Sequence, residues 1–486
     1  MHFLSSYAQT NFKLFTKPGC SQGSRPLALT PFALISAILL LAGISGCGGA
    51  QLNPNAALRT ASTSPSTSPS SSDASASAGS TSAINPGASA PPVSLLTFGN
   101  AGFGGDDTTV FQNALNNTAA NGQSLLVPAG SYNISPILFP NNSQLLLAAG
   151  VTVTANPGYG PLDTMLKIAS QNVTIQGAGA ASVIFQMRKS EYVAEHSSDH
   201  SEWRHCLDIE GASNVTISGI SCNQSGGDGL YVADGAAGPS QNVTITNSVF
   251  DQNFRQGFSL ISGVHIFVSN CYFTNTSGTA PEAGIDIEPN TPHNTVADVH
   301  ITNNFSTGNA GAGLLISLNQ LNGSSASVDI TVSNYSSASN RLSGYQIGNN
   351  DVSPNVQGNV LIQSSSSTND GSYGAVGIGF DADGPTVVFQ NLSITNPHKN
   401  GPDPIYGDSA AVGCIRGGGG VYPIGNIQFQ AVSIAVTNGM VNRYFDFQDY
   451  SNLGVQKMVF NPTALSGASL VPPNGLMQAA GFNSVD

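Results

Sequence analysis

Between residues 229 and 380, the chain repeats one short pattern in which a glycine is followed by residues that alternate between apolar and variable positions. Alternation with a period of two predicts strands with one buried face, and recurrence about every thirty residues predicts a solenoid of stacked coils. Stacking places residues that are distant in the chain about 4.8 Å apart on one sheet. The six segments are Gly229–Val232, Gly257–Leu260, Gly284–Ile287, Gly313–Ile316, Gly344–Ile347 and Gly377–Phe380.

A column of asparagines supports the same stack. Asn247, Asn270, Asn303 and Asn334 each follow a strand-like segment of alternating apolar residues. Asparagine tolerates the left-handed turn conformation, and stacked side-chain amides can hydrogen-bond along the solenoid axis. We therefore expect this column to be structural.

Composition narrows the class of protein. Only 8% of the 486 residues are charged, and Gly, Ser, Asn and Thr are abundant, as in an all-β solenoid with many turns. The net charge is −13 with only 14 Lys and Arg, which argues against a nucleic-acid partner. The same acidity would repel a polyanionic glycan unless a cation or a basic patch intervened.

The N-terminal region predicts export. An apolar run at residues 32–42 is short for a membrane span and is followed by Ile44-Ser45-Gly46-Cys47. These four residues resemble a bacterial lipobox, which implies cleavage before Cys47 and a lipid on its thiol. An ordinary secretory signal or a single-span anchor is the alternative. We expect a monomer at the outer membrane, in the periplasm or at the cell surface.

Four regions follow from these patterns. They are a signal at residues 1–47, a Ser/Thr/Pro/Ala-rich disordered linker at 48–92, the coiled domain at 93–470 and a tail at 471–486. Within the domain, Asp106–Thr109 suits a helix N-cap, and the apolar residues of 110–115 share one helical face. A helix here would cap the open end of the solenoid.

The segment Gly104–Thr108 with Val127–Tyr132 resembles the opening segment of the pectate-lyase superfamily. That resemblance extends over most of residues 93–460. It implies an all-β, single-stranded right-handed parallel β-helix with an N-terminal capping helix, and activity on polysaccharides.

Four cysteines lie in the domain, with spacings that fit neither a CxxC motif nor a metal site. We expect them to be packed core thiols, with a disulfide as the alternative because the compartment would be oxidising. They are Cys206, Cys222, Cys271 and Cys414.

The aligned glycines define a candidate catalytic face. If the residue after each glycine points inward, then Tyr231, Ser259 and Asp286 point outward, and Glu288 follows Asp286 on the same face. Asp286 and Glu288 would be about 6 to 7 Å apart, which leaves retaining and inverting glycosidase geometries open. The same alternation of inward and outward positions places Asp208 and Glu210 on the outer face.

Charged residues just before the glycines extend this strip. Asp228, Arg255 and Glu282 fall on consecutive coils, which is a notable concentration in a chain with so few charges. We assign catalysis to Asp228, Arg255, Asp286 and Glu288, and substrate binding to Asp208, Glu210, Tyr231, Ser259 and Glu282. A solvated face neutralised by Arg255 is the alternative.

A loop at residues 188–205 precedes the Asp208 strand and carries the only tryptophan, Trp203, together with His205. Loops on a rigid β-helix can wall a substrate groove, so Trp203 and His205 are predicted to bind substrate. Trp203 could instead fold the loop onto the helix. His196 and His200 lie outside any helical pattern, which disfavours a metal site.

Comparison with polygalacturonase-like relatives gives a partial match. Asp228-Gly229 occupies the position of their first catalytic aspartate. Arg255-Gln256 stands where an acidic pair is expected, and Ala283-Gly284 stands where a histidine would precede glycine. The resemblance therefore implies the fold more strongly than the polygalacturonase mechanism.

Three functions remain open on these residues. In a hydrolase without a cofactor, two carboxyls among Asp228, Asp286 and Glu288 act as acid and as base or nucleophile. In a lyase, Asp228, Glu282 and Asp286 hold Ca²⁺ against a uronate while Arg255 or Lys189 takes a proton. The third function is a non-catalytic glycan-binding or adhesin β-helix. Scarce Lys and Arg favour hydrolysis of a neutral or weakly charged glycan.

Overall fold

The computed structural model describes residues 91–195, 202–349, 354–372, 374–379, 382–399, 401, 410–416, 424–438, 440–441, 443–449, 455–466 and 477–480. They belong to one compact unit, Ser89–Asp486. Cys47, the predicted signal and nearly all of the predicted linker lie outside these residues, as do His196 and His200. No helix among the described residues has the length and apolar character needed to cross a membrane.

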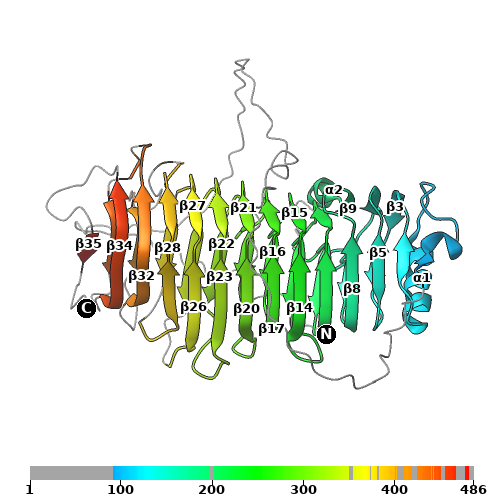
Figure 1. Ribbon diagram of the computed structural model, residues 1–486, viewed down its shortest axis with the longest axis horizontal. Coiled ribbons are helices and arrows are strands. Elements are labelled where there is room, and N and C mark those ends of the chain that lie inside the picture. The colour runs from blue at the N-terminus through cyan, green and yellow to red at the C-terminus, as the bar shows by residue number, and fades with distance from the viewer. Residues whose placement is uncertain are drawn as a thin grey trace, which may run out of the picture. The chain divides into compact units, whose positions relative to one another are not determined.

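Each complete coil contributes three strands, and equivalent strands of successive coils pair in parallel to form three walls (Figure 1). The first wall is a 12-stranded sheet. In stacking order it consists of β4 (Ile137–Leu138), β7 (Leu166–Ile168), β10 (Leu207–Glu210), β13 (Leu230–Ala233), β16 (Phe258–Leu260), β19 (Ile285–Ile287), β22 (Leu314–Leu318), β25 (Tyr345–Asn349), β28 (Val376–Gly379), β31 (Ala410–Arg416), β33 (Arg443–Asp449) and β35 (Met477–Ala480).

The other two walls belong to one continuous 23-stranded sheet. The second wall contains β1 (Val93–Ser94), β2 (Leu125–Val127), β5 (Gln144–Leu147), β8 (Gln171–Gly177), β11 (Ser213–Ser218), β14 (Ser240–Thr246), β17 (Gly263–Ser269), β20 (Val296–Thr302), β23 (Val328–Ser333), β26 (Gly358–Gln363), β29 (Thr386–Gln390), β32 (Ile424–Ala435) and β34 (Val455–Ser466). The third wall contains β3 (Gly130–Ile134), β6 (Val151–Ala155), β9 (Val183–Gln186), β12 (Ser221–Asn223), β15 (Val249–Asp251), β18 (Tyr272–Thr274), β21 (Phe305–Thr307), β24 (Ser336–Ala338), β27 (Ser366–Thr368) and β30 (Ser393–Thr395).

Every second side chain of a strand points inward, and these side chains fill the interior. On the first wall, Leu230, Phe258, Ile285 and Leu314 stack in register and are fully buried. Aromatic rings add contacts between coils, as in the stacked pair Phe250 and Phe273, with centroids 5.3 Å apart. The predicted alternation and the parallel stack are therefore confirmed.

The repeated glycines have a steric cause. A Cβ on Gly229, Gly257, Gly284 or Gly313 would lie only 2.5–2.8 Å from the carbonyl oxygen of the next glycine in the column. The sixth predicted segment is misaligned, because Gly344 is followed in this column by Ala375 rather than Gly377. The slip is two residues, so Ile378 still points inward beside Ile347.

Gly257→Ala is expected to destabilise the fold by about 1 to 3 kcal/mol, because its Cβ would lie 2.5 Å from the backbone oxygen of Gly284. Gly379→Ala is the matched control, since a Cβ there meets no atom within 4 Å. Urea unfolding of both variants measures the difference. Equal midpoints would refute the steric explanation of the column.

The predicted asparagine column is confirmed. Asn247, Asn270, Asn303 and Asn334 all have φ between 52° and 56°, and Asn334 Nδ2 donates to Asn303 Oδ1 at 3.0 Å. A second ladder, which the sequence analysis did not identify, joins Asn142, Asn172, Asn214 and Asn242 by amide hydrogen bonds of 2.9–3.0 Å.

The capping helix is confirmed as α1 (Thr108–Ala120), at the β2 end of the stack (Figure 1). The short 3₁₀ helix η2 (Leu95–Thr97) precedes it. The apolar face of α1 is buried and carries Phe111, Ala114 and Leu115. Asp107 makes no side-chain cap; its carboxylate instead accepts hydrogen bonds from Gly102 N (3.1 Å) and Asn133 N (2.9 Å), which ties the helix to β3.

Candidate active site

The predicted order of residues on the first wall is confirmed. Asp208 pairs with Tyr231, Tyr231 with Ser259, and Ser259 with Asp286. Leu230 and Val232 belong to the main core, whereas Tyr231, Ala233 and Ile261 form a separate apolar cluster. Tyr231 and its column therefore lie on the outer side of the wall. We call Asp208, Tyr231, Ser259 and Asp286 the outer column.

The prediction that these residues form an exposed surface strip is wrong, and so is the alternative of a solvated face for this column. Ser259 and Asp286 have no exposed area, Asp208 is 2% exposed and Tyr231 is 7% exposed. Asp228 is also fully buried. Other side chains cover the wall, so a residue can point away from the core and still be buried.

Residues 202–205 and Arg255 form this cover. The His205 ring stacks on Tyr231 with centroids 4.5 Å apart, and Trp203 meets Tyr231 edge-on at 6.0 Å. Arg255 bridges the cover to the wall, with Nε 3.0 Å from Glu202 Oε2 and Nη2 3.2 Å from Glu288 Oε2. Trp203 is nevertheless 49% exposed, so it presents a ring to solvent while packing on the site.

Arg204 anchors the cover from beneath. It is fully buried, its Nε donates to Tyr159 O and Gly160 O, and its guanidinium lies 4.9 Å from the centroid of Tyr192. Tyr192 belongs to α2 (Lys189–Glu195), a helix that the sequence analysis treated as loop. A Cβ on Gly227 would lie 2.2 Å from Glu202 O, so this glycine permits the close crossing.

His205 and Asp228 interact directly beneath this cover. The backbone N–H of Asp228 donates to His205 Nδ1 at 3.0 Å, which assigns the ring proton to Nε2. Burial lowers the pKa of His205 to about 3, with help from the charges of Arg255 and Lys167, so the ring is neutral. Burial raises the pKa of Asp228 to about 7, although Arg255 opposes the shift.

Asp286 lies in a second buried environment. Gln256 Nε2 donates to Asp286 Oδ2 at 2.7 Å, while Gln256 Oε1 accepts from Ala283 N. Burial and the charge of Glu288 raise the pKa of Asp286 well above its ordinary value. Burial alone would lower the pKa of Arg255, but the surrounding carboxylates raise it, so Arg255 remains a fixed cation.

Lys167 is a site residue that the sequence analysis missed. Its Nζ lies 2.9 Å from Asp208 Oδ2 and 2.7 Å from Glu210 Oε2. Burial and the charge of Glu210 raise the pKa of Asp208 to about 6. Lys167 pairs with Asp208 in the sheet, so extending the alternation one coil upstream would have found it.

Glu282 makes its contacts at a corner of the coil. Its carboxylate accepts from Gly278 N at 2.7 Å and lies 3.6 Å from Arg341 Nη2. Lys189 Nζ donates to Asn253 O and Ser277 Oγ. Within the described ranges, no group of three His, Cys, Asp or Glu side chains is arranged to hold a metal ion.

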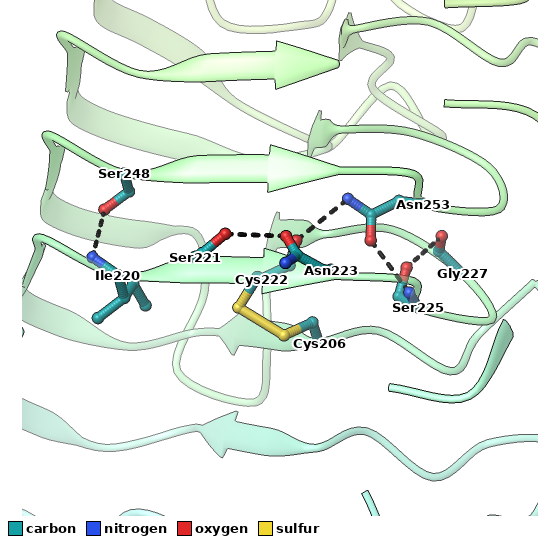
Figure 2. Close-up of a disulfide and its surroundings, with 9 residues drawn as sticks. All are labelled: Cys206, Ile220, Ser221, Cys222, Asn223, Ser225, Gly227, Ser248 and Asn253. Carbon is teal, nitrogen blue, oxygen red and sulfur yellow. Dashed lines mark hydrogen bonds between the residues drawn. A yellow bond between two sulfur atoms is a disulfide. The ribbon is translucent and has the colours of Figure 1, made fainter. Parts of the chain in front are cut away.

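A disulfide cross-links the coil that carries His205 and Asp208. Cys206, at the start of β10, is bonded to Cys222 of β12 (Figure 2). The expectation that these were packed thiols is therefore wrong, because the coil folds back on itself and brings two residues sixteen apart into contact. Cys271 is a buried free thiol, and the side chain of Cys414 lies outside the described part.

Hydrogen bonds around the disulfide tie its coil to the next one. Asn253 Oδ1 accepts from Ser225 N at 3.1 Å, and Ile220 N donates to Ser248 Oγ at 3.5 Å (Figure 2). Ser225 Oγ donates to Gly227 O at 2.8 Å, next to Asp228. The backbone that carries Asp228 is thus held on both sides.

Unsatisfied polar atoms gather at this site. Leaving a buried polar atom without a hydrogen bond costs about 1 to 3 kcal/mol, so a cluster of such atoms needs a functional reason. Among the described residues, those at the site are His205 Nε2, Asp208 Oδ1, both carboxyl oxygens of Asp228, Arg255 Nε, Ser259 Oγ and Asp286 Oδ1.

The raised pKa of Asp228 also predicts that the stability of the protein depends on pH. Its ordinary pKa of 3.8 rises to about 7 on folding, so the native state holds a proton between these values that the unfolded chain has lost. The stabilisation is complete below about pH 4 and is lost as pH rises through 7. Asp228→Asn should therefore gain about 4 kcal/mol relative to the parent between pH 4 and pH 8, since each unit of pKa shift corresponds to about 1.4 kcal/mol. Urea unfolding at both pH values measures this. A constant difference between the two proteins would contradict the raised pKa.

Comparison with known proteins agrees with this architecture. The model of the right-handed β-helix region matches residues 201–412. The A-module of Azotobacter vinelandii mannuronan C-5 epimerase AlgE4 is 16% identical with a TM-score of 0.50, over 81% of this chain and 99% of that one. The Streptococcus pneumoniae surface protein and adhesin PfbA is 14% identical with a TM-score of 0.51, over 77% and 97%. No curated protein sequence matches significantly. The chain therefore has the fold of a right-handed parallel β-helix.

Proposed function

We propose that this protein hydrolyses glycosidic bonds of a neutral polysaccharide at the first wall, where Asp228 and Glu288 adjoin the outer column. The observation that carries the proposal is the set of three buried carboxyl groups, Asp208, Asp228 and Asp286, which come from separate coils. Acid–base cleavage of a glycoside uses two carboxyl groups whose environments give them different pKa values.

The environments assign the roles. Asp228 is the proton donor to the leaving oxygen, because its pKa of about 7 keeps it protonated near neutral pH. Glu288, 29% exposed and ion-paired with Arg255, is the carboxylate that activates water or attacks the sugar. Asp286 interacts electrostatically with both groups, and burial together with the charge of Glu288 raises its pKa well above the ordinary value.

Electrostatics support a neutral substrate. Lys167 is paired with two carboxylates, and so is Arg255. Neither cation is left to neutralise a uronate, and the whole chain carries −13. A polyuronate would meet repulsion along the wall.

Access requires a movement at the cover. Asp228 and Asp286 are fully buried, whereas Trp203 is half-exposed above them. The substrate therefore displaces Trp203 or Arg255 and stacks a sugar ring on the Trp203 indole. The Arg255 pair with Glu202, which is 38% exposed, is the contact to be broken.

Elimination is the less favoured chemistry. Arg255 has a raised pKa and is a poor base, and Lys189, whose pKa burial lowers, donates to the backbone near Asn253. A lyase would also draw on Ca²⁺, with Asp228, Glu282 and Asp286 as ligands, but the contacts of Glu282 are with Gly278 and Arg341.

A binding function is the second candidate, favoured by the fold similarity to a surface protein and adhesin. The disulfide supports action in an oxidising compartment, in agreement with export and a lipid on Cys47. Such a protein would bind the same glycan without turnover.

Incubation with a panel of neutral and acidic polysaccharides tests the proposal. We expect new reducing ends from a neutral glycan, no ultraviolet absorbance of an unsaturated uronate, and no loss of activity with a chelator. Absorbance with dependence on Ca²⁺ would establish elimination. Binding without products from any member of the panel would establish the adhesin alternative.

A further inference from the structure

A cavity opens beyond the outer column, at the end of the first wall near α1. It has a volume of about 260 Å³ and lies between α1, β4 and the segment at residues 162–164. That is the space of about nine waters at roughly 30 Å³ each, the size of a sugar ring. The mechanism above uses only its edge residue, Lys167.

The cavity lies on the same outer side of the first wall as the catalytic residues. Leu138 of β4 pairs with Lys167, and Lys167 pairs with Asp208, the first member of the outer column. Leu138 is outward, since its neighbour Ile137 is buried in the core. Five coil steps of about 4.8 Å separate Leu138 from Asp286, a path of about 24 Å on one face of the wall.

The rim of the cavity is unusually apolar for exposed surface. Leu162 is 74% exposed and Leu138 is 56% exposed, and both line the cavity. Pro136 adds a third apolar surface. Apolar faces of this kind pack against the C–H face of a sugar ring.

Polar groups complete the lining. Gln112 donates to Leu138 O at 2.8 Å and accepts from Leu138 N at 2.9 Å, so the helix holds the rim in place. Asp163, Thr164 and Lys167 offer hydrogen-bonding atoms for hydroxyl groups. Asp163 adds a negative charge, and Asp208 and Glu210 offset Lys167, so a uronate is disfavoured.

We infer that this cavity is a subsite for a neutral hexose ring of the glycan whose scissile bond lies at the outer column. The assignment of the glycan rests on the proposed function, whereas the location of ring binding rests on the cavity alone. A glycan that reaches from Asp286 to Leu138 crosses the strands from β19 to β4 once the cover has moved, so long substrates gain contacts that short ones lack.

The test compares Leu138→Ser/Leu162→Ser with the control Leu96→Ser, which alters another leucine that is 50% exposed and lies outside the cavity lining. The parent, the control and the double variant all carry Asp228→Asn, so that turnover does not consume the hexasaccharides. Glucose, galactose, mannose and their linear hexasaccharides are titrated and observed by NMR, with galacturonate as the acidic comparison.

At least one neutral hexose should bind the control with the parent Kd and bind the double variant about tenfold more weakly, which is about 1.4 kcal/mol. Equal binding by all proteins overturns the inference, as does preference for galacturonate. Absence of any hexose binding to the parent also overturns it, and shows that something else, such as an N-terminal segment or a second copy, fills the cavity.

The two proposals fail separately. If Asp228→Asn stops turnover but the leucine substitutions do not affect sugar binding, the subsite is wrong and the hydrolase stands. If hexose binding depends on the leucines but no glycan is cleaved, the cavity binds sugar and the hydrolase is wrong.

Discussion

Replacing Asp228 with asparagine is expected to lower kcat for glycoside hydrolysis by about 10²- to 10⁴-fold, the usual contribution of a general acid. Asparagine keeps the shape of the side chain and leaves the backbone hydrogen bond to His205 intact, but it has no proton to donate. Initial rates on the glycan identified by the reducing-end assay measure the effect.

Glu288→Gln should cause a loss of similar size, because an amide can neither activate water nor attack the sugar. The double variant Asp228→Asn/Glu288→Gln should have a kcat only slightly below that of the less active single variant, since the two groups act in one step. Asp329→Asn is the control, because Asp329 is exposed on β23 of the second wall. Unchanged rates in both site variants would remove the carboxyl mechanism.

The pH profile separates catalysis from structure. Activity of the parent should fall as pH rises through about 7, when Asp228 loses its proton. In Asp228→Asn this limb should disappear from the residual activity. Persistence of the same limb would assign it to another group.

Removal of the disulfide is expected to cause a large loss of stability. Cys206→Ser/Cys222→Ser should lower the free energy of unfolding by about 3 kcal/mol, the value for closing a loop of about fifteen residues. The stapled coil carries His205 and Asp208, so the loss should be accompanied by lower activity at temperatures below unfolding. Urea midpoints with and without reductant measure it.

Reductant itself supplies the control. The parent should lose stability when reduced, whereas the double serine variant should not respond. Cys271→Ala keeps the disulfide and should remain sensitive to reductant, although its buried thiol is lost. A parent that is insensitive to verified reduction would show that the bond adds nothing to stability.

The repeat pattern was sufficient to predict the stack and the order of the outer column. A strand has a side-chain period of two, and each glycine forbids a Cβ against the next coil, so Asp208, Tyr231, Ser259 and Asp286 must align. Even the misplacement of Gly377 by two residues preserved which side chains face the core.

The sequence alone therefore determined the solenoid, its capping helix and the line of residues that share a face, because these follow from local periodicity and steric limits. Tertiary structure alone decided that the line is buried, that Lys167 joins it, that Cys206 meets Cys222 and that a cavity lies beyond Leu138. Those features depend on how the Glu202–His205 segment and the coil corners pack across the wall, and no repeat in the chain encodes that packing.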